Sequence, residues 1–197
     1  MQPISQQITS VGKMIFDRHF TDMAGGNISC RQDESIYITP TGAGQKYLWN
    51  LSVNQIICAP IFSDELFENP LHSKESISHL LVYRTYPHVK AIIHAHPFHV
   101  LPFCAAGKPM KAVLKSTQVY GSEFEMIAEK PMYSQEQGDE IVERLRGKDE
   151  VMKIFGAALL MPKHGVFIAA PNLYKAMDCL ERMSTNAWCI LAQKMMS

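Results

Sequence analysis

The stretch Val89–Pro97 constrains the fold more than any other part of the chain. Ala91–Ala95 is apolar and partly β-branched, which predicts a buried strand, and Pro97 ends it because proline cannot donate a ladder hydrogen bond. Side chains alternate between the two faces of a strand, so His94 and His96 project from the same face. Two imidazoles so placed can bind one divalent metal, although a lone His-x-His pair is more often structural.

The composition is typical of a globular protein and shows no bias toward a charged partner. The 197 residues, 47% of them apolar, are enough to bury a core, and we expect one domain spanning residues 1–197. A net charge of zero argues against nucleic acid or an anionic membrane as a partner. There is no apolar run of the roughly 18 residues that a membrane span needs. With no signal-peptide pattern and no Cys-x-x-Cys pair, we expect a cytoplasmic protein with reduced thiols.

Hydrophobic periodicity and turn residues predict a mixture of helices and strands. The expected helices are residues 3–20, 73–86, 97–106, 138–146 and a long one from 172 onward. The expected strands are residues 35–38, 54–59, 91–95, 157–161 and 166–170. Residues 62–70 are expected to form a polar loop and residues 107–138 irregular structure with short strands. A tight turn at Lys163–Gly165 makes the sheet at least partly antiparallel.

Two glycine-rich segments are candidates for binding an anion. Ala24–Ser29 contains paired glycines and an asparagine, which permit positive φ angles and expose backbone amides. Thr39–Gly44 follows a predicted strand and combines glycines with hydroxyl side chains. Each motif is weak by itself, because such sequences are more often simple turns.

A metal held by His94 and His96 requires a third ligand, and Glu75 and His164 are the candidates. Glu75 opens a helix that leads directly into the histidine strand. A carboxylate there is also favourable simply because it lies at a helix N-terminus. His164 lies at a hairpin turn, and spacing alone cannot bring it to the other two histidines.

Five motifs in order resemble the class II aldolase/adducin family, and within it the L-fuculose-1-phosphate aldolases. They are Gly25-Gly26-Asn27-Ile28-Ser29, Thr39-Pro40-Thr41-Gly42, Ser73-x-Glu75-x-x-x-His79, His94-x-His96-Pro97 and Lys163-His164-Gly165. The resemblance spans essentially the whole chain. It implies an α/β/α three-layer sandwich with a largely antiparallel central sheet, and a homotetramer with active sites between subunits.

The same resemblance implies the residues of the site. Zn²⁺ would be held by His94, His96 and His164, with Glu75 as the proton-transfer group. The substrate would be a phosphorylated ketose, cleaved to dihydroxyacetone phosphate and an aldehyde. The metal would stabilise the resulting enediolate as a Lewis acid, and no Schiff-base lysine is needed. The residues implied for binding the substrate phosphate are Gly26, Asn27, Thr41, Gly42 and Ser73.

Two positions depart from the pattern of these aldolases. Lys74 stands where a second serine is expected before the acid, and it could contact phosphate only as a point charge. The tyrosine that these enzymes carry after the histidine strand falls on Lys115 in a gapless alignment, with Tyr120 the nearest tyrosine downstream. Lys115 and Tyr120 are therefore the two candidates for the second proton donor.

Two other reactions and one non-catalytic role of this fold are alternatives. Ribulose-phosphate 4-epimerases use an acidic residue in a segment ending in Tyr-Gly, and Thr117–Gly121 has none. Methylthioribulose-1-phosphate dehydratase shares the metal site and the helix acid, so it is the main enzymatic rival. A non-catalytic interaction domain, as in adducin, predicts loss of the metal histidines, and this chain keeps all three.

Overall fold

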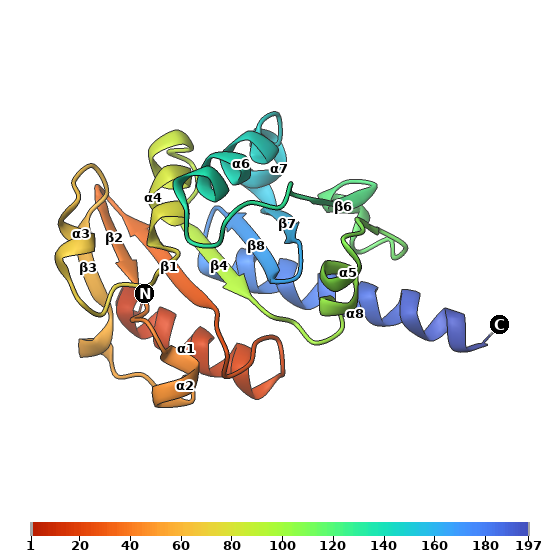
Figure 1. The fold of residues 1–197 in the computed structure, drawn as a ribbon, viewed down its shortest axis with the longest axis horizontal. Coiled ribbons are helices and arrows are strands. Elements are labelled where there is room, and N and C mark those ends of the chain that lie inside the picture. Colours follow the sequence, from red (N-terminus) through yellow and green to blue (C-terminus); the bar gives the residue numbers. More distant parts are fainter. Residues whose placement is uncertain (1, 197) are drawn as a thin grey trace.

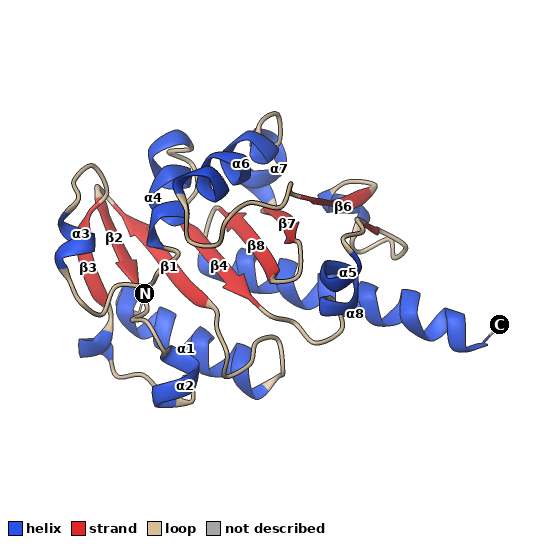
Figure 2. Ribbon diagram, in the orientation of Figure 1, coloured by secondary structure: helices blue, strands red, loops and turns tan. Residues whose placement is uncertain are grey.

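An eight-stranded sheet forms the centre of the computed structural model, which describes residues 2–196 (Figures 1 and 2). The strand order is β3-β2-β1-β4-β8-β7-β6-β5. Among these strands β6 and β7 pair in parallel and all other neighbours are antiparallel, which confirms the predicted largely antiparallel sheet. The strands are β1 Asn27–Gln32, β2 Ser35–Ile38, β3 Ile57–Pro60, β4 Ala91–Ala95, β5 Met110–Lys111, β6 Glu123–Met126, β7 Ala157–Met161 and β8 Gly165–Ala170.

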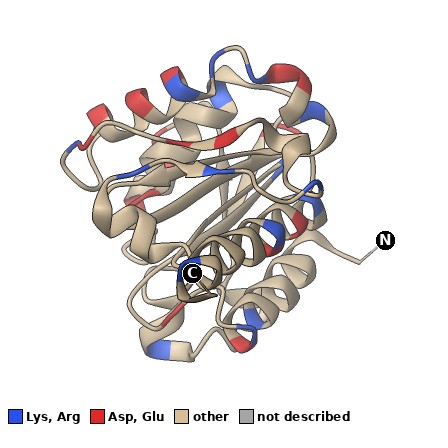
Figure 3. Ribbon diagram, turned by 90° about the vertical axis from the view of Figure 1, so that its right-hand side faces the viewer, with Lys and Arg blue, Asp and Glu red and all other residues tan. Residues whose placement is uncertain are grey.

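Helices cover both faces of the sheet, which gives the predicted three-layer α/β/α arrangement (Figures 1 and 3). One apolar cluster joins α1 and α8 to one face, and a second joins α4 and α6 to the other. Within residues 2–196 no helix has both the length and the apolar content needed to cross a membrane. The helices are α1 Ile4–Asp17, α2 Ala43–Tyr47, α3 Glu65–Glu68, α4 Ser76–Thr85, α5 Leu101–Ala106, α6 Gln135–Leu145, α7 Asp149–Ile154 and α8 Leu173–Met196; two 3₁₀ turns lie at Val53–Gln55 and Gln118–Tyr120.

Strand β4 lies in the middle of the sheet, between β1 and β8, and all five of its residues are buried. The register pairs His94 with Asn27 on β1 and with Phe167 on β8. Because β8 runs antiparallel to β4, the start of β8 lies beside the end of β4, with Val166 opposite Ala95. The turn that carries His164 therefore reaches the same end of the sheet as His94.

Strand β1 is the main element that the sequence did not predict, since we expected a turn through Ala24–Ser29. The strand already begins at Asn27 and alternates polar with apolar side chains. Ser29 is fully buried, and its hydroxyl lies 2.7 Å from Nδ1 of His79 and 2.8 Å from the hydroxyl of Tyr83 on α4. Buried polar groups satisfied in this way remove the apolar signal by which a buried strand is recognised.

Several short elements also differ from the predictions. A single helical turn, α3, lies inside the expected loop 62–70, and α7 was not predicted. The strand expected at residues 54–59 begins only at Ile57, after a 3₁₀ turn. Helix α6 begins at Gln135, ahead of the expected position 138, because the hydroxyl of Ser134 accepts the amide of Gln137 as an N-cap. Elements of one or two turns carry too few residues to show a period.

Candidate metal centre and its cavity

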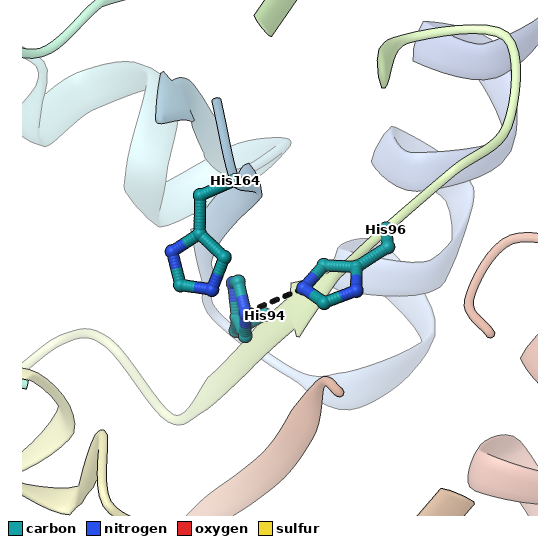
Figure 4. Close-up of side chains that lie close together, drawn as sticks. All are labelled: His94, His96 and His164. Carbon is teal, nitrogen blue, oxygen red and sulfur yellow. Dashed lines mark hydrogen bonds between the residues drawn. The ribbon is translucent and has the colours of Figure 1, made fainter. Parts of the chain in front are cut away.

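Three histidine rings converge at the end of β4 (Figure 4). His94 lies on β4, His96 directly follows it, and His164 lies in the turn between β7 and β8. One ligand nitrogen from each ring lies within 4.8 Å of the others. The close approach requires glycine at Gly165, where a Cβ would lie 2.5 Å from the carbonyl oxygen of Ala95. The structure thus places His164, which sequence spacing alone could not locate, beside His94 and His96.

The hydrogen bonds of His94 and His96 leave both Nε2 atoms free to accept. Nδ1 of His94 lies 2.9 Å from the carbonyl oxygen of Val166, which only accepts, so Nδ1 carries the proton. Nδ1 of His96 likewise lies 3.0 Å from the carboxylate of Asp22. The two Nε2 atoms then face each other with lone pairs at 3.2 Å. Ligands of a tetrahedral Zn²⁺ lie about 3.3 Å apart, given the usual Zn–N distance, so this geometry fits a shared metal.

The electrostatics of the cluster favour the form of histidine that binds metals. Burial, with the neighbouring rings of His164 and His96, holds the pKa of His94 well below its usual value. Burial also lowers the pKa of His164 to about 4. Both rings are therefore neutral near pH 7, and neutral imidazole is the metal ligand. The residues present fit a divalent transition metal, and the donor set alone does not decide which one.

Glu75 lies against this cluster, immediately before α4. One carboxylate oxygen, Oε2, lies 3.1 Å from Nε2 of His94, and the other, Oε1, lies 3.8 Å from Nε2 of His164. Burial raises the pKa of Glu75 to about 7, while a hydrogen bond from Asn27 Nδ2 at 2.7 Å opposes the shift. A carboxyl group with such a pKa can both accept and donate a proton near neutral pH. Because Glu75 lies beside the histidines, its position is not explained by a favourable interaction with the helix N-terminus alone.

A cavity of about 260 Å³ opens over the histidines and Glu75. Its other walls are the segments Met23–Asn27 and Thr41–Lys46, with Ser73, Lys74 and Tyr133. All nine predicted site residues line it: Gly26, Asn27, Thr41, Gly42, Ser73, Glu75, His94, His96 and His164. The sequence did not point to Lys46 or Tyr133, because a lysine on a short helix and a tyrosine in an irregular segment carry no motif.

The two glycine segments approach the site closely because their glycines lack a side chain. Gly26 has a φ of +98°, and a Cβ there would lie 2.8 Å from the hydroxyl oxygen of Thr21. Gly42, with a φ of +73°, precedes α2. Glycines in such conformations, together with the lining residues Lys46 and Lys74, make the cavity suitable for an anion.

Asp22 is a site residue that no sequence motif indicates. Its Oδ1 is 3.0 Å from Nδ1 of His96 and also accepts the amides of Ala24, at 2.9 Å, and Gly25, at 3.2 Å. Two backbone amides therefore hold the carboxylate, and the carboxylate orients the imidazole. Carboxylates that orient metal-ligating histidines in this way also make the ligand more basic.

Replacing Asp22 with Ala is expected to lower the affinity for Zn²⁺ by about 10- to 100-fold, because His96 loses the partner that fixes its ring. Competition with a chromophoric chelator measures this affinity. Asp22→Asn keeps an acceptor oxygen and should retain most of it. Equal affinities in the Ala variant and the wild type would show that Asp22 does not support the metal ligand.

The two candidates for a second proton donor do not reach the cavity. Tyr120 is half-buried, and its hydroxyl donates to Asp178 on α8 at 3.4 Å, while its ring packs against Phe124 and Phe155. Lys115 is exposed and is absent from the residues that line the cavity. These are positions within one chain, and the assignment of a second proton donor in residues 107–133 stays a prediction.

Comparison with known proteins agrees with the fold. The model of the class II aldolase and adducin N-terminal domain matches residues 6–191. A 3-oxo-tetronate 4-phosphate decarboxylase of Haemophilus influenzae is 27% identical over 183 residues, covering 91% of this chain and 83% of that protein. An L-fuculose phosphate aldolase of Methanococcus maripaludis is 21% identical over 170 residues, covering 86% of each chain.

A solved structure shows the same fold. The L-fuculose-1-phosphate aldolase of Thermus thermophilus superposes with a TM-score of 0.82 at 20% identity, over 98% of this chain and 94% of that one. The order of motifs, the layered sheet and the match over nearly the whole length agree with one another. The chain belongs to the family of class II aldolases and adducin N-terminal domains.

Proposed function

We propose that this protein is a metal-dependent lyase that breaks the bond between C3 and C4 of a phosphorylated ketose, leaving the carbanion beside the ketone, and releases dihydroxyacetone phosphate and an aldehyde. One observation carries the proposal. Three imidazoles and the carboxyl group of Glu75 meet in a cavity that two glycine segments also line. The first group suits carbanion chemistry, and the second suits a phosphate.

The phosphate side of the cavity would orient the substrate. Backbone amides around Gly26 and Gly42 would contact the phosphate, with the ammonium groups of Lys46 and Lys74 nearby. Binding a group remote from the reacting bond turns binding energy into orientation. The side chains that we propose for the same contact are Asn27, Thr41 and Ser73.

The reacting side would hold the metal and move the proton. His94, His96 and His164 are the proposed ligands, and Zn²⁺ the proposed ion. When bound, such an ion lowers the energy of the negative charge that forms on the ketone oxygen as the bond breaks. Glu75, 3.1 Å from His94, would then give its proton to the carbon left behind. The 5% exposure of Glu75 limits competition from water.

Decarboxylation is a second candidate, because loss of CO₂ from a 3-oxo-tetronate 4-phosphate also leaves the carbanion of dihydroxyacetone phosphate. Within one chain, neither Tyr120 nor Lys115 lines the cavity, which is compatible with this reaction. Aldol cleavage needs a base for the proton of the departing hydroxyl group, whereas CO₂ leaves without one. The similarity to a decarboxylase, which covers 91% of this chain, also supports decarboxylation as the second candidate reaction.

The remaining expectations are part of the proposal. We propose a cytoplasmic homotetramer with active sites between subunits. Two exposed aromatic side chains, Phe98 and Trp188, line an apolar hollow of about 330 Å³ beside α8 that such an assembly would cover. The dehydratase and the epimerase are the alternative reactions. Retention of all three histidines around a shared point does not favour a non-catalytic interaction domain.

One substrate panel separates these reactions. Zinc-loaded protein is incubated with L-fuculose 1-phosphate, ribulose 5-phosphate, methylthioribulose 1-phosphate and 3-oxo-tetronate 4-phosphate, and the products are identified by NMR. We expect dihydroxyacetone phosphate, from the ketose for an aldolase or from the oxo acid for a decarboxylase. An inverted sugar would identify an epimerase, and loss of water a dehydratase. Lack of turnover of all four by metal-loaded protein would contradict the proposal.

A further inference from the structure

Tyr133 is a tyrosine of the cavity wall that no sequence motif assigns to a role. Its side chain is part of the lining although the residue is 42% exposed. Its backbone has a φ of +66°, in the left-handed region that is uncommon for a bulky side chain. Such a conformation persists only where surrounding structure enforces it, and it is concentrated at functional sites.

Helix α6 holds Tyr133 in this conformation. The amide of Tyr133 donates to the side-chain oxygen of Gln137 at 3.2 Å, and the amide of Gln137 donates to the hydroxyl of Ser134 at 3.1 Å. Gln137 is buried, with 4% of its surface exposed. The turn that carries the tyrosine is therefore fixed from both sides by the start of the helix.

Close packing of α6 against α4 brings this turn to the cavity. At Gly138 an added Cβ would lie 2.5 Å from Cδ1 of Leu81 and 3.3 Å from Cα of Ser78. A larger residue at this position would require the side chain of Leu81 and the backbone near Ser78 to shift. Tyr133, two residues ahead of α6, consequently lies near Lys74 and Glu75, which immediately precede α4 and line the same cavity.

The ring contacts of Tyr133 place it near the reacting groups. Its ring meets that of His164 edge-on at 6.5 Å between centroids. The ammonium group of Lys74 lies over the ring, 5.6 Å from its centroid. Both partners line the cavity, His164 as a proposed metal ligand and Lys74 as the chain neighbour of Glu75.

We infer that the Tyr133 hydroxyl contacts the reacting end of the substrate as a hydrogen-bond donor, an inference that rests on the proposed lyase function. In aldol cleavage, the hydroxyl group of the departing carbon passes its proton to water, and its oxygen carries negative charge until the carbon–carbon bond breaks and the charge moves to the ketone oxygen. A neutral phenol held beside His164 donates to the oxygen of the departing carbon and stabilises the charge as it forms. This is the role of second proton donor, for which the sequence analysis named Lys115 and Tyr120 as candidates. In decarboxylation the same donor binds the carboxylate before it leaves, and its loss raises KM instead.

Tyr133→Phe and Tyr120→Phe form a matched pair, since each removes one hydroxyl and keeps the ring. With L-fuculose 1-phosphate, Tyr133→Phe should lower kcat by about 100-fold or more, as loss of one transition-state donor does. With the oxo acid it should raise KM. Tyr120→Phe should leave both constants unchanged, because its hydroxyl is engaged with Asp178. Wild-type values of kcat and KM in Tyr133→Phe would overturn the inference.

A binding experiment separates this inference from the proposed reaction. Zinc-loaded Glu75→Gln protein carrying ¹³Cε-labelled tyrosine is titrated with L-fuculose 1-phosphate, and the signal of Tyr133 is identified by its loss in Tyr133→Phe. A saturable shift of that signal supports the contact even where turnover is lacking. Sugar-phosphate binding that moves other signals and leaves Tyr133 unchanged overturns the contact alone. Absence of any binding overturns both proposals.

Discussion

Replacing His94 with Ala is expected to abolish both metal retention and turnover. His94 is the histidine that touches every other part of the centre, with Nε2 3.2 Å from His96 and 3.1 Å from Glu75. Its removal takes away one of three ligands, so the loss should exceed the roughly 10- to 100-fold expected for a supporting residue such as Asp22. Metal content by mass spectrometry, followed by product formation with added Zn²⁺, measures the effect.

The control for this variant is His99→Ala. His99 lies three residues beyond His96, but its Nδ1 pairs with the hydroxyl of Ser184 and its ring packs on Trp188. This variant should keep its metal. His94→Gln fills more of the buried space and guards against a loss caused by unfolding, which circular dichroism would reveal. A folded His94→Ala protein with wild-type zinc content would show that the three histidines do not form the metal site.

Glu75→Gln is expected to lower kcat by about 10²- to 10⁴-fold, the usual contribution of a general acid or base, while metal content stays unchanged. Glutamine keeps the volume of the side chain and an oxygen that can accept from Asn27 Nδ2. It cannot accept and return a proton. The carboxylate oxygens of Glu75 lie close enough to His94 and His164 for either proton transfer or metal binding. A lower kcat with unchanged metal content would identify proton transfer as its role.

Calorimetric titration with dihydroxyacetone phosphate should show that the Glu75→Gln protein still binds the product. Glu65→Gln on α3, where the side chain is exposed, is the matched substitution outside the site and should have full activity. Cleavage at the wild-type rate by Glu75→Gln would rule out Glu75 as the proton-transfer group.

The parts of the fold with a simple period were predictable from the sequence. The apolar run of β4 and the alternation along a strand placed His94 and His96 correctly on one face. Strand β1 was missed because Ser29, buried against His79 and Tyr83, breaks the apolar pattern. A strand buried through apolar side chains was therefore predictable, whereas a strand whose buried polar side chains are satisfied by hydrogen bonds was not.

The site was predictable only where short motifs or the family resemblance reached it. His164 needed the resemblance, because the pairing of β8 with β4 that brings it to His94 cannot be derived from spacing. Asp22 and Tyr133 were missed because each acts through geometry set elsewhere, in the loop before β1 and in the packing of α6 on α4. The phosphate contacts stay predictions, although all the residues concerned line one cavity.

The most direct test of the account is hydrogen exchange on dihydroxyacetone phosphate in D₂O, followed by proton NMR. Aldol cleavage and decarboxylation both end with a proton delivered to the same carbon, so metal-loaded protein should exchange one hydrogen of the hydroxymethyl carbon without any aldehyde or oxo acid. The exchange should stop when a chelator removes the metal and in Glu75→Gln. Failure of metal-loaded wild-type protein to exchange bound dihydroxyacetone phosphate would contradict the account.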